Sequence, residues 1–182
     1  FICYNHFMFL SGNIKADVQP DTTIRLLEDV VYQEGDNMYT VPIDYVSDGA
    51  TVPKCTSWLY PRMGEYLKSA VLHDYLITNG LDKKEFVIES NRVDELFRES
   101  MKTLGIPFAR RWTMWLGVRL GALLNPLRRK GSLKTLPKVI LVMLLAGPIL
   151  LPASLVVQLT IWLLWAVTLP LPKKKRLDAQ TV

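Results

Sequence analysis

The sequence predicts an α+β fold: a small N-terminal antiparallel β-sheet or meander, a three-helix layer and a C-terminal hydrophobic helical hairpin. Three observations predict it. The N-terminal part alternates β-branched and aromatic residues with turn residues, helical periodicities follow, and no charged side chain occurs between residues 139 and 172. We therefore expect a globular domain over residues 1–130, a hydrophobic helical segment over 131–176 and a short tail over 177–182.

The sheet is expected between residues 8 and 46. Residues 23–32 and 38–43 are rich in Val, Ile, Tyr and Thr, as strands are. Between them, Gly35 and Asn37 can adopt positive φ, which predicts a tight turn and hence a hairpin or a three-stranded meander.

Three helices are expected between residues 64 and 124. Apolar side chains recur at helical spacing over residues 64–79, 91–104 and 108–124. Gly80 fits the end of the first helix and Asn91 fits the N-cap of the second.

Two polar residues of the first helix are candidates for function. At 100° per residue, Asp74 falls inside the apolar face and His73 lies at its margin. A carboxylate on an apolar face is costly unless it is paired or binds a metal. We therefore expect Asp74 to have a cationic or metal partner.

The apolar tract over residues 139–172 predicts membrane association. Pro148 and Pro152 divide it into two legs of about 14 and 17 residues, each shorter than a ~30 Å hydrocarbon core. This pattern favours a shallow or re-entrant hairpin. The expected anchors at the membrane surface are Trp162, Trp165, Lys173, Lys174, Lys175 and Arg176. The alternative is a hairpin buried inside a protein assembly.

The net charge of +5 is concentrated at the two ends of this tract. Such a placement favours a phospholipid membrane as the partner. Nucleic-acid recognition would call for basic residues spread along a folded face, so we expect no specific recognition of this kind.

Several ordered motifs resemble a phage and prophage family, domain of unknown function 1353, between residues 8 and 121. They are Leu26-Leu27-Glu28-Asp29, Val41-Pro42, Ser47-Asp48-Gly49-Ala50-Thr51-Val52-Pro53, Ala70-Val71-Leu72-His73-Asp74-Tyr75 and Arg92-x-Asp94-x-x-Phe97-x-x-x-Met101. The resemblance implies a phage-encoded protein. Together with the apolar tract it leads us to expect a virion-associated structural or delivery protein, synthesised in the cytoplasm. It would assemble with other virion proteins as an oligomer and engage the host membrane, for instance during genome ejection.

A more distant resemblance is to the small prokaryotic phospholipases of the A2 type. Their Asp-Gly calcium loop, helical His-Asp pair and later Asp have the order of Asp48-Gly49, His73-Asp74 and Asp94. The resemblance implies that Asp48, Asp74 and the Gly49 carbonyl bind Ca²⁺. It also implies that His73 is a general base whose tautomer Asp94 fixes. The alternative function is thus a calcium-dependent phospholipase-like esterase.

The chain departs from those phospholipases at three positions. Ala50 and Val71 stand where they carry cysteines, and Ile77 stands where they carry a tyrosine.

The structural and enzymatic interpretations require different geometries. The enzyme requires His73 to face Asp94 and the Asp48 and Asp74 carboxylates to converge. A purely structural role has Asp74 neutralised by arginine, and Asp94 stabilising its helix dipole or pairing with Arg98. The expected arginine partners of Asp74 are Arg62, Arg92 and Arg110.

Overall fold

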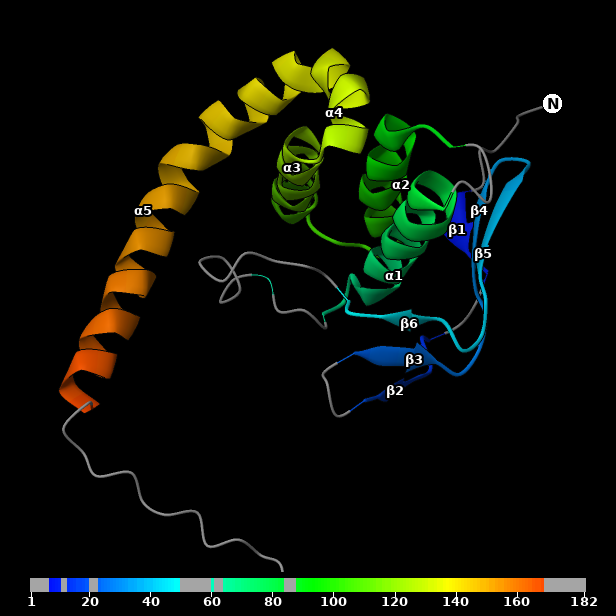
Figure 1. The fold of residues 1–182 in the computed structure, drawn as a ribbon, viewed down its shortest axis with the longest axis horizontal. Coiled ribbons are helices and arrows are strands. Elements are labelled where there is room, and N and C mark those ends of the chain that lie inside the picture. The colour runs from blue at the N-terminus through cyan, green and yellow to red at the C-terminus, as the bar shows by residue number, and fades with distance from the viewer. Residues whose placement is uncertain are drawn as a thin grey trace, which may run out of the picture.

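The structure, a computed structural model, describes residues 7–10, 13–19, 23–49, 60, 64–83 and 88–168. The predicted α+β fold is confirmed, because short strands come first and helices follow (Figure 1). The described strands are β1 (Phe7–Phe9), β2 (Ala16–Val18), β3 (Ile24–Leu26), β4 (Val30–Glu34), β5 (Asn37–Val41) and β6 (Val46–Ser47). The described helices are α1 (Leu67–Tyr75), the π-helix η1 (Leu76–Asp82), α2 (Ser90–Thr103), α3 (Phe108–Leu124), α4 (Pro126–Ser132), the 3-10 helix η2 (Leu133–Thr135) and α5 (Leu136–Thr168).

The described strands form two antiparallel sheets of three strands each, with orders β1-β4-β5 and β2-β3-β6. Consecutive strands change sheet after β1, β3 and β5. Between β3 and β4, Asp29 accepts a hydrogen bond from the Ile43 backbone N–H. The turn between β4 and β5 is as expected, since Gly35 adopts φ 56°.

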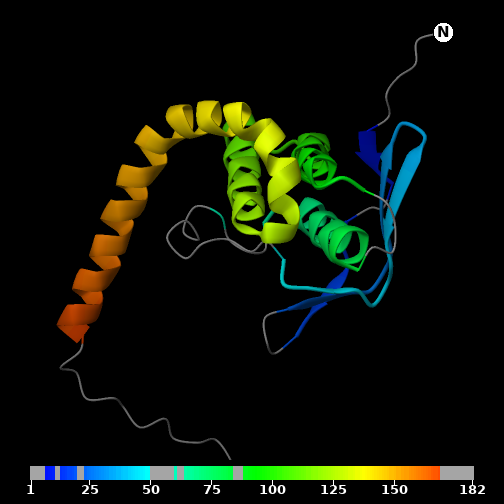
Figure 2. The ribbon, with the colours of Figure 1, turned by 45° about the horizontal axis from the view of Figure 1, so that its top comes forward.

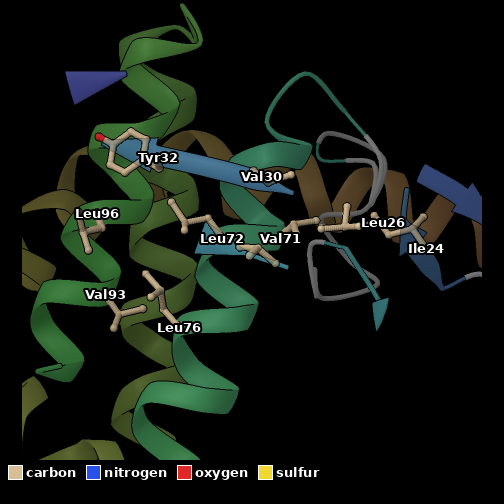
Figure 3. Close-up of a cluster of buried hydrophobic side chains, with 10 residues drawn as sticks. Ile24, Leu26, Val30, Tyr32, Val71, Leu72, Leu76, Val93 and Leu96 are labelled. Carbon is tan, nitrogen blue, oxygen red and sulfur yellow. The ribbon is translucent and has the colours of Figure 1, made fainter. Parts of the chain in front are cut away.

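The main core lies between the strands and the first two long helices (Figure 3). Strand residues at alternate positions and helix residues at helical spacing point into it. Its buried side chains are Ile24, Leu26, Val30, Tyr32, Val41, Val71, Leu72, Leu76, Val93 and Leu96. This packing fixes the relative positions of α1 and α2, which carry the candidate site.

The helices α1 and α2 lie between the β1-β4-β5 sheet and α3 (Figures 1 and 2). A second buried cluster, which includes Phe97, Met101 and Met114, joins α2 to α3. A third, of Trp115, Leu116 and Val139, joins α3 to the first turns of α5.

Two details of the helix predictions are wrong. The first helix does not stop at Gly80, because helical structure continues through the π-helix η1 to Asp82. The wider π turn accommodates an additional residue, so the glycine is not needed as a terminator. The N-cap of α2 is Glu89 rather than Asn91, whose side chain instead accepts a hydrogen bond from Arg119. The third predicted helix matches α3 in both bounds.

The predicted C-terminal hairpin is also wrong, because α5 is one 33-residue helix that contains both Pro148 and Pro152. A proline in a helix removes one backbone hydrogen bond and bends the axis, and the remaining bonds can continue the helix. Both views show α5 leaving the body beside α4 and curving away from it (Figures 1 and 2).

Candidate functional site

A histidine and an aspartate from neighbouring helices meet at the centre of the helical layer. The Nε2 atom of His73 on α1 lies 2.8 Å from Oδ1 of Asp94 on α2. The carboxylate is fully buried, whereas 14% of the His73 side chain is exposed. When neutral His73 donates from Nε2, its Nδ1 carries the free lone pair that a general base needs.

Two arginines share the same carboxylate. Arg119 of α3 donates from Nη1 to Asp94 Oδ2 at 2.8 Å, and Arg128 of α4 donates from Nη2 to Oδ1 at 2.6 Å. Arg119 also donates to the Asn91 side chain, the Ser132 carbonyl and the Thr135 hydroxyl. Asp94 therefore connects α1, α2, α3 and α4 through one buried polar cluster.

The charge state of Asp94 follows from opposing influences. Burial is the largest, and it acts to raise the pKa of Asp94. The hydrogen bond and charge of His73, the charge of Arg128 and the hydrogen bond from Arg119 act together in the other direction. They hold the pKa of Asp94 below its usual value, so this buried group is a carboxylate at neutral pH.

Asp74 lies in a different environment. The Tyr45 hydroxyl donates to Asp74 Oδ2 at 3.1 Å. Burial, followed by the charge of Asp48, raises the pKa of Asp74, while hydrogen bonds from Ser47 and Tyr45 and the charge of His73 oppose this rise. Asp48 is therefore close enough to repel the Asp74 carboxylate.

The backbone next to Asp48 forms a tight turn. Gly49 adopts φ 73°, a conformation that favours glycine, and its N–H donates to the Ser47 hydroxyl at 3.1 Å. The turn thus places the Asp48-Gly49 segment beside Asp74, at the end of β6.

The arginines expected beside Asp74 are bound to other carboxylates. Arg92 pairs with Glu34 and Glu99, and Arg110 lies 3.6 Å from Glu65. Arg62 lies outside the described residues.

The arginine expected beside Asp94 is also engaged elsewhere. Arg98 pairs with Glu95 and lies 3.6 Å from Glu99. Asp94 is nevertheless held by arginines, but they come from α3 and α4.

The described residues contain no group of three or more His, Cys, Asp or Glu side chains placed to hold a metal ion. The ligand set implied by the phospholipase resemblance is smaller, with the carboxylates of Asp48 and Asp74 and the Gly49 carbonyl. All three supply oxygen, which Ca²⁺ prefers. By this donor chemistry the residues fit the ion, and a cation would also offset the charge of Asp48, which adds to burial in raising the pKa of Asp74.

The π-helix η1 begins two residues after Asp74. Such segments are rare and are found often at functional sites, because they change the direction of side chains within a helix. Its Asn79 is buried, and within the described part of the chain its side-chain oxygen has no hydrogen-bond partner. The irregular backbone thus directly follows the helix that carries His73 and Asp74.

Sequence reasoning missed Arg119 and Arg128 on Asp94, and Tyr45 and Ser47 on Asp74. A signal for Arg119 exists, because it lies four residues after Trp115 on the face of α3 that Ala122 continues. An arginine on an apolar face requires a buried acidic partner.

The expected membrane anchors are only partly described. Trp162 and Trp165 are exposed on α5, with ring centroids 6.4 Å apart. Lys173, Lys174, Lys175 and Arg176 lie outside the described residues.

One family profile, described as "Protein of unknown function (DUF1353)", matches residues 24–118 of the 182. The chain belongs to this family. The DUF1353 match extends from β3 into α3 and includes Asp48, His73, Asp74 and Asp94. No curated protein and no solved structure matches the chain.

Proposed function

We propose that this DUF1353 protein is a virion-associated structural or delivery protein of a phage. In this proposal it engages the host membrane through α5, in the course of genome ejection, and works in an oligomeric assembly with other virion proteins. The observation that carries the proposal is the exposed apolar surface of α5.

The length of α5 suits a bilayer. Its 33 residues extend about 50 Å at 1.5 Å per residue, more than the ~30 Å of a hydrocarbon core. The stretch Leu133–Val167 is long and apolar enough to cross a membrane, and 11% of its most apolar window is buried. A core helix of similar composition would be mostly covered by protein, so the exposed surface favours lipid as its environment.

Bilayer attachment is tested by placing three arginines on α5. We expect the full chain to float with phosphatidylcholine liposomes in a density gradient. It should also stay with the liposomes when they are extracted with alkaline carbonate. The triple substitution Leu155→Arg, Leu159→Arg and Leu163→Arg should abolish flotation, because each central arginine costs about 2.5–3.5 kcal/mol in a bilayer.

A control of equal charge is available at exposed positions in or next to the strands, as Val18→Arg, Leu27→Arg and Met38→Arg. The control variant should float like the unaltered protein. Equal flotation of all three proteins, or of none, would contradict attachment through α5. The virion part of the proposal is tested by mass spectrometry of purified particles of the encoding phage, and absence of the protein there would refute it.

A second candidate is a calcium-dependent phospholipase-like esterase, which the contact between His73 and Asp94 favours. His73 would accept a proton from water at Nδ1, while Asp94 holds the ring through Nε2. When bound by Asp48, Asp74 and the Gly49 carbonyl, Ca²⁺ would supply Lewis-acid stabilisation of a developing oxyanion. The exposed edge of His73 is compatible with access of a substrate.

The esterase is tested by lysophospholipid release from mixed micelles with calcium present. His73→Ala should lower release by at least about a hundredfold, as loss of a general base does. Asp74→Asn should raise the calcium concentration needed, whereas Asp17→Asn, which alters an exposed carboxylate on β2, should not. No release from the unaltered protein, or equal release from His73→Ala, would remove this candidate and leave the membrane role intact.

A further inference from the structure

The corner between α3 and α4 carries unusually exposed leucines. Leu127 is 81% exposed and Leu124 is 79% exposed, the two highest values among the large hydrophobic side chains that the structure describes. Leu133 in η2 is also exposed. We name these three leucines, together with Arg129 and Lys134, the elbow.

The elbow backbone is held firmly in place. Asn125 leaves the helical conformation at ψ 118°, and its side chain accepts a hydrogen bond from the Leu127 N–H at 2.9 Å. Pro126 occupies the start of α4, where a missing N–H costs nothing. The exposure of the leucines is therefore a property of an ordered, capped helix.

The inner side of α4 contacts the buried polar cluster around Asp94. Arg128 donates to Asp94 Oδ1 at 2.6 Å and to the Ser90 hydroxyl at 3.0 Å. Turning Leu127 inward would require α4 to rotate and Arg128 to leave the buried carboxylate. Because that rearrangement is costly, the leucines stay on the outer surface of α4. They are therefore exposed to water unless another molecule covers them.

The charged residues that neighbour the elbow in the sequence have one sign. The sequence contains no Asp or Glu between Glu99 and Asp178. Arg129 and Lys134 are exposed, and Arg129 donates from Nε to the Leu123 carbonyl, which keeps its guanidinium beside the leucines. Leucines whose charged neighbours in the sequence are all basic suit an anionic, amphipathic surface.

The elbow is also continuous with the apolar helix, since Leu133 is the first residue of the stretch long enough to cross a membrane. We propose that the elbow is a second membrane contact, in which its leucines enter the headgroup boundary and its basic residues bind anionic phospholipid. This inference rests on the proposed attachment through α5. Through Arg128, the same helix that touches lipid also supports the His73–Asp94 pair.

The test measures amide exchange by mass spectrometry on the full chain in nanodiscs. One set contains phosphatidylcholine alone, and the other contains added phosphatidylglycerol. Two basic residues should raise the affinity of the elbow for an anionic surface about 30-fold. Amide exchange over residues 124–135 should therefore be roughly tenfold or more slower with phosphatidylglycerol than with phosphatidylcholine alone. Raising the salt concentration should remove most of this protection.

Paired variants isolate the leucines. Leu124→Gln with Leu127→Gln should lose the protection, whereas Leu27→Gln with Met38→Gln, exposed positions next to β3 and in β5, should keep it. Equal exchange in both lipids, or unchanged protection in the elbow variant, would overturn the proposal.

The peptides of α5 separate the two possible failures. Protected α5 peptides with a freely exchanging elbow would overturn the elbow contact alone. Free exchange in both α5 and the elbow would overturn the elbow contact and also the proposed membrane attachment through α5. Elbow protection that grows with protein concentration in lipid-free detergent would assign the surface to a second copy of the chain and would likewise overturn the lipid contact.

Discussion

At the scale of single residues, Asp94 is the side chain that links α2 to α1, α3 and α4. It is fully buried and bonds to His73, Arg119 and Arg128. A buried charge is tolerated when it is paired and hydrogen-bonded, and both oxygens of this carboxylate meet that condition. The same pairing suits a structural strut, and it also suits the base-orienting carboxylate of the proposed esterase.

Removing the charge of Asp94 should destabilise the protein strongly. We expect Asp94→Asn to lower the free energy of unfolding by about 3–5 kcal/mol, because it leaves Arg119 and Arg128 buried without a counter-charge. Chemical unfolding of the full chain in mild detergent, followed by near-UV circular dichroism, measures this loss. The exposed Asp17→Asn should change the same quantity by less than about 0.5 kcal/mol, and a similar small effect of Asp94→Asn would show that the cluster contributes little.

Replacing Asp74 should have a pH-dependent effect of the opposite sign. Its pKa is raised in the folded state, so its contribution to stability is fully present below the unfolded pKa of 3.8 and is lost as pH rises through the folded value. Asp74→Asn stays uncharged and should therefore be more stable than the unaltered protein at pH 7. This advantage should disappear below about pH 4, since both side chains are then neutral.

Thermal unfolding of Asp74→Asn and the unaltered protein across this pH range checks the prediction. A variant that is less stable at pH 7 would show that ionised Asp74 has a favourable partner. The reason for expecting a gain is that burial disfavours the charged form of Asp74, and asparagine carries no charge.

The approach of His73 to Asp94 was expected only from the order of motifs in the phospholipase resemblance, since helix periodicity by itself placed His73 at the margin of an apolar face. The sequence was not sufficient for the arginine partners of Asp94, since Arg119 and Arg128 lie 25 and 34 residues away and reach it only through tertiary packing. The Tyr45 contact with Asp74 is likewise a product of the packing of a strand end against α1.

At the scale of elements, α5 has two parts with different surroundings. Val139 is buried against Trp115 and Leu116 of α3, and Lys138 donates to Glu95 of α2 at 2.9 Å. Beyond Val142, most of the large side chains of α5 are exposed. The first turns therefore belong to the packed body, and the remainder extends from it.

This division predicts different costs for neighbouring substitutions. Val139→Ala should lower the free energy of unfolding by roughly 2 kcal/mol, because it removes two buried methyl groups from a packed contact. The adjacent exposed residue gives a matched control, since Ile140→Ala should cost under about 0.5 kcal/mol. Equal effects in chemical unfolding would indicate that α5 does not pack on α3.

Element boundaries were predictable where local signals agree. Pro107 and the positive φ of Gly105 separate α2 from α3, and both bounds of α3 follow from the sequence. The hairpin was wrongly predicted because Pro148 and Pro152 were treated as ends of helices, although a long apolar helix can bend at proline and continue. The π-helix η1 has no comparable local signal.

At the scale of the whole molecule, the α+β order was predictable because periodicity changes once along the chain, from strands to helices. The division of the strands into two sheets was not, since strand pairing depends on contacts between distant segments. The resulting protein has a sheet-and-helix body at one end and, at the other, a helix that carries no charged side chain beyond Lys138. The exposed apolar surface of that helix needs a partner, and we propose the bilayer.

The measurement that tests this claim most directly is the accessibility of a nitroxide on α5 to oxygen and to a water-soluble nickel chelate. The label is attached at Leu159→Cys in liposome-bound protein whose Cys3 and Cys55 are replaced by serine. If α5 lies in the bilayer, the label at position 159 should collide more with oxygen than with the chelate, and a label at Val18→Cys should show the reverse. A label at position 159 that is as open to the chelate as the one at position 18, or shielded from both reagents by protein, would contradict attachment through α5.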